Sequence, residues 1–304
     1  MNSFEYNGVL IDDTFAEAFP MKVVRIIITA ENQQWALNSA VSMTGFATSV
    51  IACGCEASIE SSLNSELTPD KRPGVSVLIF SMSGRELAKQ VETRVGQCVL
   101  TCPTTSVFSG FEDGEPINLS KNLRFFGDGW QISKVINEKR FWRIPTMDGE
   151  FLGEETTKLK KGVGGGNLLI LAKDTLSALS IAQIGVEAIK NIPNVITPFP
   201  GGVVRSGSKV GSKYKSLLAS TNHKFCPALK NVVFDSQLSS DVGSVMEIVI
   251  DGVTEQDVFI AMKESMKVML GLGKSSGLIR LSAGNYGGKL GPFHFHLGKI
   301  FQEI

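Results

Sequence analysis

The order in which strand-length and helix-length apolar segments alternate is the same in both halves of this 304-residue chain. In each half, short apolar runs flank segments whose apolar residues recur at helical spacing, so that a strand–helix–strand unit occurs twice. A pair of such βαβ units is typical of a ferredoxin-like sandwich. The sequence therefore predicts an α+β fold made of two tandem ferredoxin-like (split βαβ) lobes.

The same pattern sets the expected element boundaries. The first half gives strands at 22–30, 46–52, 74–80 and 97–101 and helices at 32–43 and 83–95. The second half gives strands at 167–172, 194–199, 244–251 and 277–283 and helices at 174–190 and 254–270. Residues 148–162 are rich in Gly, Glu, Thr and Lys and indicate a linker, which predicts domains at 1–148 and 149–304.

Composition narrows the class of protein. Hydrophobic residues make up 43% of the chain and charged residues 20%, which is ordinary for a globular protein. Thirty basic and thirty acidic residues cancel, and no Lys/Arg cluster compensates, so a nucleic-acid partner is not expected. No apolar run approaches the roughly 20 residues that cross a bilayer, and no signal-peptide pattern precedes the first strand. We therefore expect a cytoplasmic protein without a membrane partner.

The five cysteines do not form a recognisable framework. Cys53 and Cys55 are separated by one residue, Cys98 and Cys102 by three, and no histidine lies near either pair in the sequence. Zinc sites favour CxxC or Cys/His spacing, so reduced, buried thiols are the expectation and no metal site is predicted.

Glycine-rich loops follow or precede several apolar runs, at 125–129, 164–167, 198–202 and 282–291. Glycine permits close approach of the backbone and positive φ angles that side chains disfavour. Any one such loop is equally well explained as a tight turn without a ligand. Four of them together predict a ligand cleft built from backbone, and the interface between two lobes is a preferred place for one.

Glu247 interrupts a strand that is otherwise apolar on both faces. Alternation over 244–251 places it on one face with Val245 and Val249. One interpretation is a solvated acid on a half-exposed face. The other is a partly buried carboxyl whose pKa is raised by desolvation, which suits acid–base chemistry.

Other motifs are weaker. A Ser separates Gly207 from Lys209, so the loop is not an NTP-binding P-loop, although its basic residues suit either an anionic ligand or plain solvation. The alternating run 293–296 indicates an exposed edge strand rather than a His-x-His metal pair. Neither a Gly-x-Ser-x-Gly elbow nor a Rossmann fingerprint occurs, which disfavours a serine acyl-enzyme and nicotinamide binding.

Distinctive stretches extend almost from end to end of the chain. They are 11–19, 44–51, 72–75, 96–99, 125–129, 198–202, 208–213, 282–285 and 287–291. In order and spacing they resemble the formylmethanofuran:tetrahydromethanopterin formyltransferase family. The resemblance implies two such lobes and reversible transfer of a formyl group between the methanofuran amine and N5 of tetrahydromethanopterin. It also implies that these two carriers are substrates and that no metal or prosthetic group is bound.

The resemblance has further implications for assembly and source. It implies a homotetramer or a subunit of a formyltransferase/hydrolase complex, working in archaeal carbon dioxide reduction or in bacterial formaldehyde oxidation. The absence of net charge favours a bacterial methylotroph over an archaeon with a saline cytoplasm. The alternative is a non-catalytic ligand-binding or scaffolding subunit of such a complex, because this fold hosts many functions.

Formyl transfer between two amines passes through a tetrahedral oxyanion, which calls for a proton donor and for backbone N–H groups. The resemblance assigns catalysis to Glu247, as proton donor or oxyanion partner. The glycine-rich and basic loops supply the candidate substrate-binding residues. These are Phe126, Asp128, Asn167, Pro200, Gly201, Gly202, Ser206, Lys209, Ser282, Asn285, Gly287 and Lys289.

Overall fold

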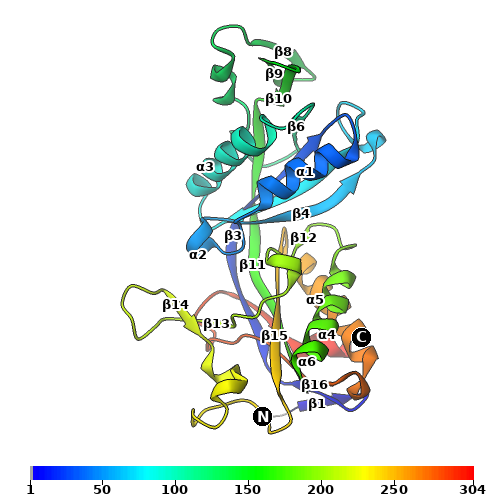
Figure 1. Ribbon diagram of the computed structural model, residues 1–304, viewed down its shortest axis with the longest axis vertical. Helices are drawn as coiled ribbons and strands as arrows, with labels where there is room; N and C mark the ends of the chain where they lie inside the picture. The colour runs from blue at the N-terminus through cyan, green and yellow to red at the C-terminus, as the bar shows by residue number, and fades with distance from the viewer. Residues whose placement is uncertain (1–2) are drawn as a thin grey trace. The chain divides into compact units, whose positions relative to one another are not determined.

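The computed structural model describes residues 3–304 and has an α+β fold with a large, mostly antiparallel sheet (Figure 1). The chain forms two compact units. One is Met21–Gly162, and the other combines Val163–Ile304 with the segment that ends at Pro20. Within residues 3–304, none of the helices combines the length and hydropathy that a bilayer-spanning segment needs.

The Met21–Gly162 unit is built around β3 (Phe15–Thr29). This strand pairs antiparallel with β5 (Gly74–Ser81) on one side and with β6 (Ser106–Ser109) on the other, and β4 (Glu56–Leu63) lies beyond β5. Alternate residues of β3, including Val24 and Ile26, pack in one core with the apolar stripes of two helices. The helices are α1 (Gln33–Thr44) and α3 (Gly84–Arg94).

Shorter elements complete this unit. A meander of β8 (Ile132–Ile136), β9 (Lys139–Thr146) and β10 (Gly149–Glu154) joins β6 through a parallel β10–β6 pair, and β7 (Glu115–Asn118) pairs with the start of β11 (Thr156–Ala172). The sheet is therefore extended by strands that the sequence pattern did not predict.

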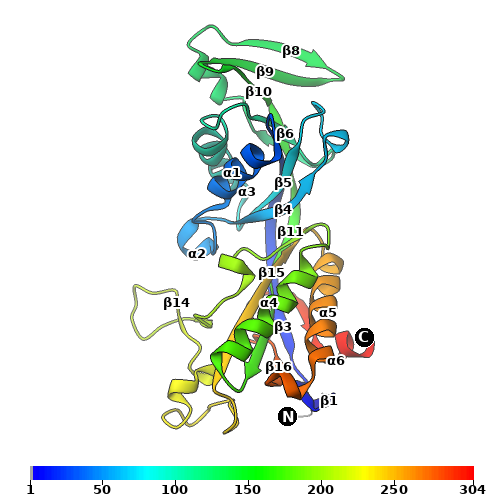
Figure 2. The same ribbon diagram turned by 45° about the vertical axis from the view of Figure 1, so that its right-hand side comes forward.

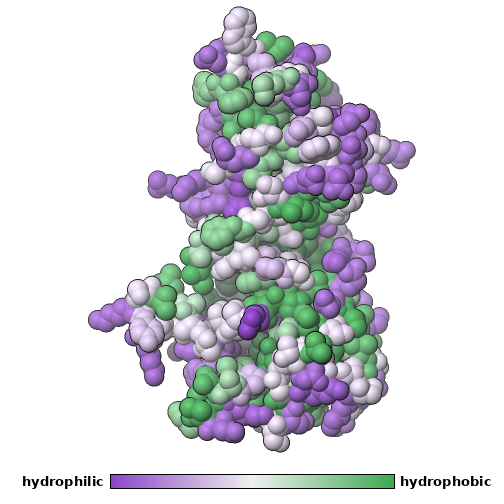
Figure 3. Space-filling model, in the orientation of Figure 1, coloured by the Kyte–Doolittle hydropathy of each residue, from purple (hydrophilic) through white to green (hydrophobic). Residues whose placement is uncertain are grey.

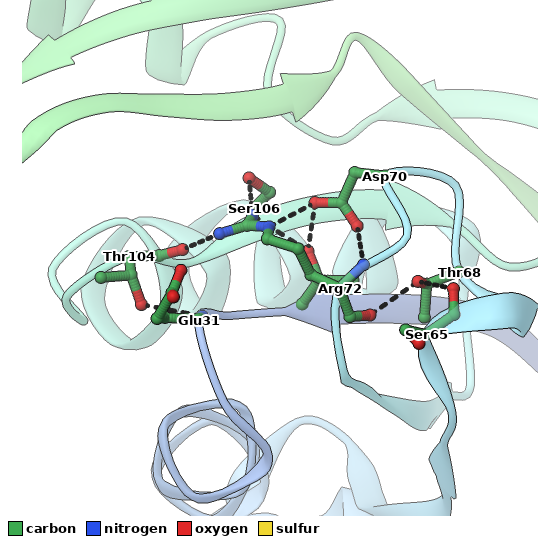
Figure 4. Close-up of polar contacts among 8 residues, drawn as sticks. Glu31, Ser65, Thr68, Asp70, Arg72, Thr104 and Ser106 are labelled. Atoms are coloured by element: carbon green, nitrogen blue, oxygen red, sulfur yellow. Dashed lines mark hydrogen bonds and ion pairs between the residues drawn. The ribbon is translucent and has the colours of Figure 1, made fainter.

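Arg72, from one of the distinctive stretches, fixes the loop before β5 (Figure 4). Its guanidinium donates to Asp70 at 2.8 Å, to the Thr104 carbonyl at 2.6 Å and to Ser106 Oγ at 2.6 Å. Its own carbonyl accepts from Thr68 Oγ1 at 2.6 Å. These bonds satisfy a charge that is largely withdrawn from solvent, so this stretch has a structural role.

The second unit is centred on β11. This strand pairs antiparallel with β15 (Ser244–Gly252) and β16 (Leu278–Ser282), and β16 is parallel to β2 (Val9–Asp12). Three shorter strands lie at the edges: β1 (Ser3–Tyr6) on β2, β12 (Val195–Ile196) on β15, and β17 (Phe293–His296) on the start of β3. A separate hairpin is formed by β13 (Ser208–Val210) and β14 (Ala219–Thr221).

Helices α4 (Thr175–Ile189) and α5 (Glu255–Leu272) run side by side against one face of these strands (Figure 2). The residues that meet them, including Leu168 and Ile170 of β11 and Ile248 and Ile250 of β15, form the core of this unit. The short helix α6 (Leu297–Gln302) adds to the same core. These helices do not cover the opposite face of the three strands, which carries a smaller apolar cluster that includes Leu169, Leu171 and Ile279.

The four predicted helices and the predicted strands that correspond to β3, β5, β11, β15 and β16 are confirmed, but two predicted strands are wrong. The stretch 46–52 leads into a short helix, α2 (Val50–Cys53), capped by Ser49 and ended by Gly54 at φ +75°. The stretch 97–101 belongs largely to a π-helical turn, Val95–Val99, because the buried stripe of α3 continues through Val95 and Val99.

Two further expectations need correction. The predicted linker 148–162 contains β10 and the start of β11, where outward-pointing lysines hide a period-two pattern whose inner positions, Thr157 and Leu159, are buried. All five cysteines are free, but only Cys55 is buried, and its burial raises the pKa of that thiol to about 11. The domain boundary at 148/149 stays a prediction.

Candidate functional site

Three of the predicted site residues lie on one face of the β15–β11–β16 sheet. Glu247 pairs with Leu169 across β15 and β11, and Leu169 pairs in turn with Ser282 of β16. Asn167 lies two positions before Leu169 on β11 and so shares its face. Because α4 and α5 cover the other face, these polar side chains lie on the face without those helices.

Glu247 is buried, with 9% of its surface exposed. Burial raises the pKa of its carboxyl from 4.5 to about 7. Burial is the one resolved cause of this shift, and no charge or hydrogen bond among residues 3–304 is resolved as offsetting it. Of the two interpretations of Glu247, the solvated acid is wrong and the buried carboxyl is confirmed. Such a group holds a proton near neutral pH and is able to donate it.

A cavity of about 300 Å³ lies against Glu247. Its wall includes Ser206, from the segment that follows the Pro-Gly-Gly turn. That segment is fixed to β15 by two backbone hydrogen bonds, from Val204 N to the Glu247 carbonyl at 2.8 Å and from Glu247 N to the Val204 carbonyl at 2.9 Å. The backbone pairing thus places Ser206 beside the buried carboxyl.

A larger cavity, of about 520 Å³, adjoins the first, since Asn222 and Phe225 line both. Its wall combines polar side chains with two lysines, Lys209 and Lys224. The predicted residues found here are Lys209, Ser282, Asn285 and Gly287. Two adjoining cavities, one with a protonatable acid and one with basic side chains, suit a reaction between two bound molecules.

Four backbone N–H groups of the glycine-rich loop after β16 are not offered to a ligand, contrary to expectation. Tyr286, Gly288, Leu290 and Gly291 all donate to the carboxylate of Glu17, a residue of β3 that is 1% exposed. Burial opposes ionisation of Glu17, but these four hydrogen bonds lower its pKa below the usual value. For these four amides the expected role as oxyanion donors is therefore not supported, because they already have a partner.

Tyr286 is a site residue that the sequence interpretation missed. Its phenol lines the larger cavity and donates to the Ser208 carbonyl at 2.9 Å. Burial first, and then the negative charges of Glu247 and Glu17, raise its pKa to about 12. The phenol therefore stays protonated as a donor. The only signal in the sequence was an aromatic residue between Asn285 and Gly287.

Other predicted residues lie elsewhere. Asn167 supports the loop, since its Oδ1 accepts from Gly284 N at 2.5 Å. The turn Pro200–Gly202 lines neither cavity and packs on α4, where a Cβ on Gly202 would lie 2.6 Å from Val186. Lys289 is on the exposed side of its loop. Phe126 and Asp128 belong to the Met21–Gly162 unit, in and just after a 3₁₀ turn. For all of these, a role in substrate binding stays a prediction.

The imidazoles of His294 and His296 contact the Phe15 ring at tilted angles, with centroids 4.5 and 5.1 Å away, and the strand predicted at 293–296 is confirmed. Within residues 3–304, no group of three or more His, Cys, Asp or Glu side chains is arranged to hold a metal ion.

An α+β protein with a buried, protonatable acid on the wall of one of two adjoining cavities has the features of a group-transfer enzyme that works by positioning and proton transfer. Comparison with known proteins gives the family. A family model described as formylmethanofuran-tetrahydromethanopterin formyltransferase matches residues 4–146, and one described as the proximal lobe of the same family matches 149–300. The chain belongs to the formylmethanofuran–tetrahydromethanopterin formyltransferase family.

Individual relatives agree with this assignment. The chain is 62% identical to the formylmethanofuran–tetrahydromethanopterin formyltransferase of Methylobacillus flagellatus, over 97% of this chain and 98% of that protein. It is similar to a chain of the Methylorubrum extorquens formyltransferase/hydrolase complex solved with methylofuran (TM-score 0.95, 46% identity, 98% and 99% coverage). It is also similar to the formyltransferase of Methanosarcina barkeri (TM-score 0.92, 44% identity, 98% and 100% coverage).

Proposed function

We propose that this chain is a formyltransferase that moves a formyl group reversibly between formylmethanofuran and N5 of tetrahydromethanopterin in one-carbon metabolism. The observation that carries the mechanism is the state of Glu247, which is a buried acid on a cavity wall with a pKa of about 7. The relatives from Methylobacillus flagellatus and Methanosarcina barkeri are named after this reaction. The two carriers are substrates, and the chemistry requires no resident cofactor.

The proposed steps conserve atoms and charge. N5 attacks the formyl carbon, the new N–C bond forms, and the carbonyl electron pair moves to oxygen. Glu247 gives its proton to this oxyanion or to the departing nitrogen. The electron pair on oxygen then re-forms the carbonyl, and any proton that the oxygen took up passes to the departing nitrogen. The old C–N bond breaks with its electron pair on that nitrogen, which leaves as the protonated methanofuran amine, and the proton lost from N5 restores the acid. General acid–base catalysis of this kind contributes about 10²–10⁴-fold.

Substrate contacts follow from the cavities. Ser206 lies beside the acid, while Ser282, Asn285 and Gly287 line the larger cavity together with Lys209, which suits an anionic substrate group. Further candidate contacts outside the two cavities are Phe126, Asp128, Asn167, Pro200, Gly201, Gly202 and Lys289.

The finer description of the fold is also a proposal. The two halves, 1–148 and 149–304, are interpreted as tandem ferredoxin-like lobes, an interpretation supported by the pair of helices that packs on the strands of each compact unit. The expected cellular location is the cytoplasm.

Assembly is proposed from the exposed apolar side chains. On the face drawn in Figure 3, hydrophobic residues are interspersed with hydrophilic ones. In the segment after β12, Tyr214, Val232 and Phe234 have 72%, 75% and 102% of their surface exposed. A relative from Methylorubrum extorquens is named as one of the subunits of a formyltransferase/hydrolase complex. We therefore expect a homotetramer or a place in such a complex.

The decisive experiment mixes purified protein with formylmethanofuran and tetrahydromethanopterin and follows the formylated pterin by chromatography. Turnover that is lost in Glu247→Gln supports the proposal. The alternative is a non-catalytic ligand-binding or scaffolding subunit, which predicts binding of a carrier without product. That outcome would overturn the catalytic proposal.

A further inference from the structure

The glycine-rich loop that joins β16 to β17 is fixed at three places. At its start, Gly284 N donates to Asn167 Oδ1. At its end, Gly291 lies so close to β3 that a Cβ there would be 2.1 Å from the Ala18 carbonyl oxygen. Between these points the backbone closes around the Glu17 side chain. The loop thus depends on a residue that is distant from it in sequence.

Both carboxylate oxygens of Glu17 are used. Oε2 accepts from Tyr286 N at 2.9 Å and from Gly288 N at 3.0 Å, and Oε1 accepts from Leu290 N and, at 3.2 Å, from Gly291 N. Converging backbone N–H groups of this kind form an anion-binding nest. Here the anion is supplied by the chain itself, and the lowered pKa of Glu17 keeps it ionised.

The loop that Glu17 holds forms part of the larger cavity. Asn285, Tyr286 and Gly287 line it directly. Through its hydroxyl, Tyr286 also bonds to Ser208 at the start of β13, and the next residue, Lys209, lines the same cavity. The position of the loop therefore sets two walls of the cavity, although Glu17 itself lines neither cavity.

We propose that Glu17 is the positioning residue of the larger cavity, fixing the loop 284–291 in the conformation that binds substrate. This inference rests on the proposed function of that cavity. Glu17 does not contact substrate. Its carboxylate accepts hydrogen bonds from backbone N–H groups of the loop. These bonds fix the loop and thereby the position of the Tyr286 side chain.

The first test reads the loop itself and needs no activity. In Glu17→Gln an NH₂ group replaces one of the two acceptor oxygens. This group is itself a donor and cannot accept hydrogen bonds from the backbone N–H groups that it faces. Leu290 N belongs to the peptide bond that trypsin cuts after the exposed Lys289. We expect cleavage at this bond to be roughly tenfold faster, and the four donor amides to exchange hydrogen faster, because bonds to a charged acceptor are lost. Glu154→Gln, at a 7% exposed acid of the other unit, should change neither.

The second test separates positioning from chemistry. In Glu17→Gln the KM for the substrate should rise roughly tenfold, while kcat stays within about threefold of wild type, since Glu247 is untouched. Glu17→Asp keeps two acceptor oxygens and should give intermediate cleavage and KM.

Each outcome decides the inference. An unchanged cleavage rate and unchanged amide exchange in Glu17→Gln would overturn it, as would a released loop with an unchanged KM. If Glu17→Gln does not fold, the same comparison between Glu17→Asp and wild type decides. If formyl transfer itself is absent from the wild type, the proposed function fails, while the loop measurements still report on Glu17.

Discussion

Glu247 and Glu154 are both buried acids, with 9% and 7% of their surfaces exposed, and burial raises the pKa of each. Only Glu247 lines a cavity of the second unit. Glu247→Gln keeps shape but removes the titrating proton, so kcat should fall by about 10²-fold or more with little change in substrate binding. Steady-state kinetics of both variants are the measurement, with Glu154→Gln as the control. A near-wild-type kcat in Glu247→Gln would refute the assignment.

The shifted pKa of Glu247 also predicts how stability depends on pH. The folded chain holds this proton up to about pH 7, whereas the ordinary value is 4.5. The stability that Glu247 contributes is therefore fully present below pH 4.5 and is lost as the pH rises through about 7. At 1.36 kcal/mol per pKa unit, the loss approaches about 3 kcal/mol.

Glu247→Gln has no such proton to lose. As the pH rises from weakly acidic to weakly alkaline, the wild type should therefore lose stability that the variant keeps. The difference between the two free energies of unfolding should shift in favour of the variant. Urea unfolding of both proteins at the two ends of that range measures the difference. Identical pH dependence in the two proteins would show that Glu247 does not have the raised pKa.

At the scale of elements, the return of the loop onto β3 depends on glycine at one position in particular. A Cβ on Gly291 would lie 2.1 Å from the Ala18 carbonyl oxygen, so Gly291→Ala has to displace β17 from β3. We expect destabilisation of about 2 kcal/mol or more. Gly287→Ala is the matched control, because its Cβ meets nothing and only its φ of +81° is unfavourable, at about 1 kcal/mol. Equal unfolding free energies for the two variants would contradict this explanation.

The elements that the sequence predicted best are those whose pattern is local. Helix α5, with its stripe of buried methionines, begins at the Thr254–Asp257 capping box, so sequence neighbours alone define it. The π-helical turn at Val95–Val99 was mistaken for a strand, since a short apolar run fits either structure.

The same distinction applies to the site. The burial of Glu247 was one of two interpretations that its own strand suggested. The role of Glu17 was not predictable, because the amides that it binds are about 270 positions away and no property of its own strand indicates them. Contacts between segments so far apart in the sequence form only in the folded chain, so a local sequence pattern does not reveal them.

At the scale of the whole molecule, exposed apolar side chains such as Phe234 predict association. Light scattering of the purified chain at micromolar concentration should give a homotetramer, or a complex once partner subunits are added. Phe234→Asp should weaken the assembly without changing the unfolding of the single chain, since its side chain contributes no buried surface there. A monomer under both conditions would contradict the prediction.

The pairing of β2 with β16 and of the start of β3 with β17 has a consequence for how the chain is made. Leu10 pairs with Arg280, and Ala18 with Phe293, so these strands leave the ribosome about 270 residues before their partners. At roughly 5–20 residues per second, this wait is on the order of tens of seconds. The Met21–Gly162 unit is contiguous and is complete in sequence well before then. During synthesis, the early strands are therefore unpaired edges that a chaperone is able to protect.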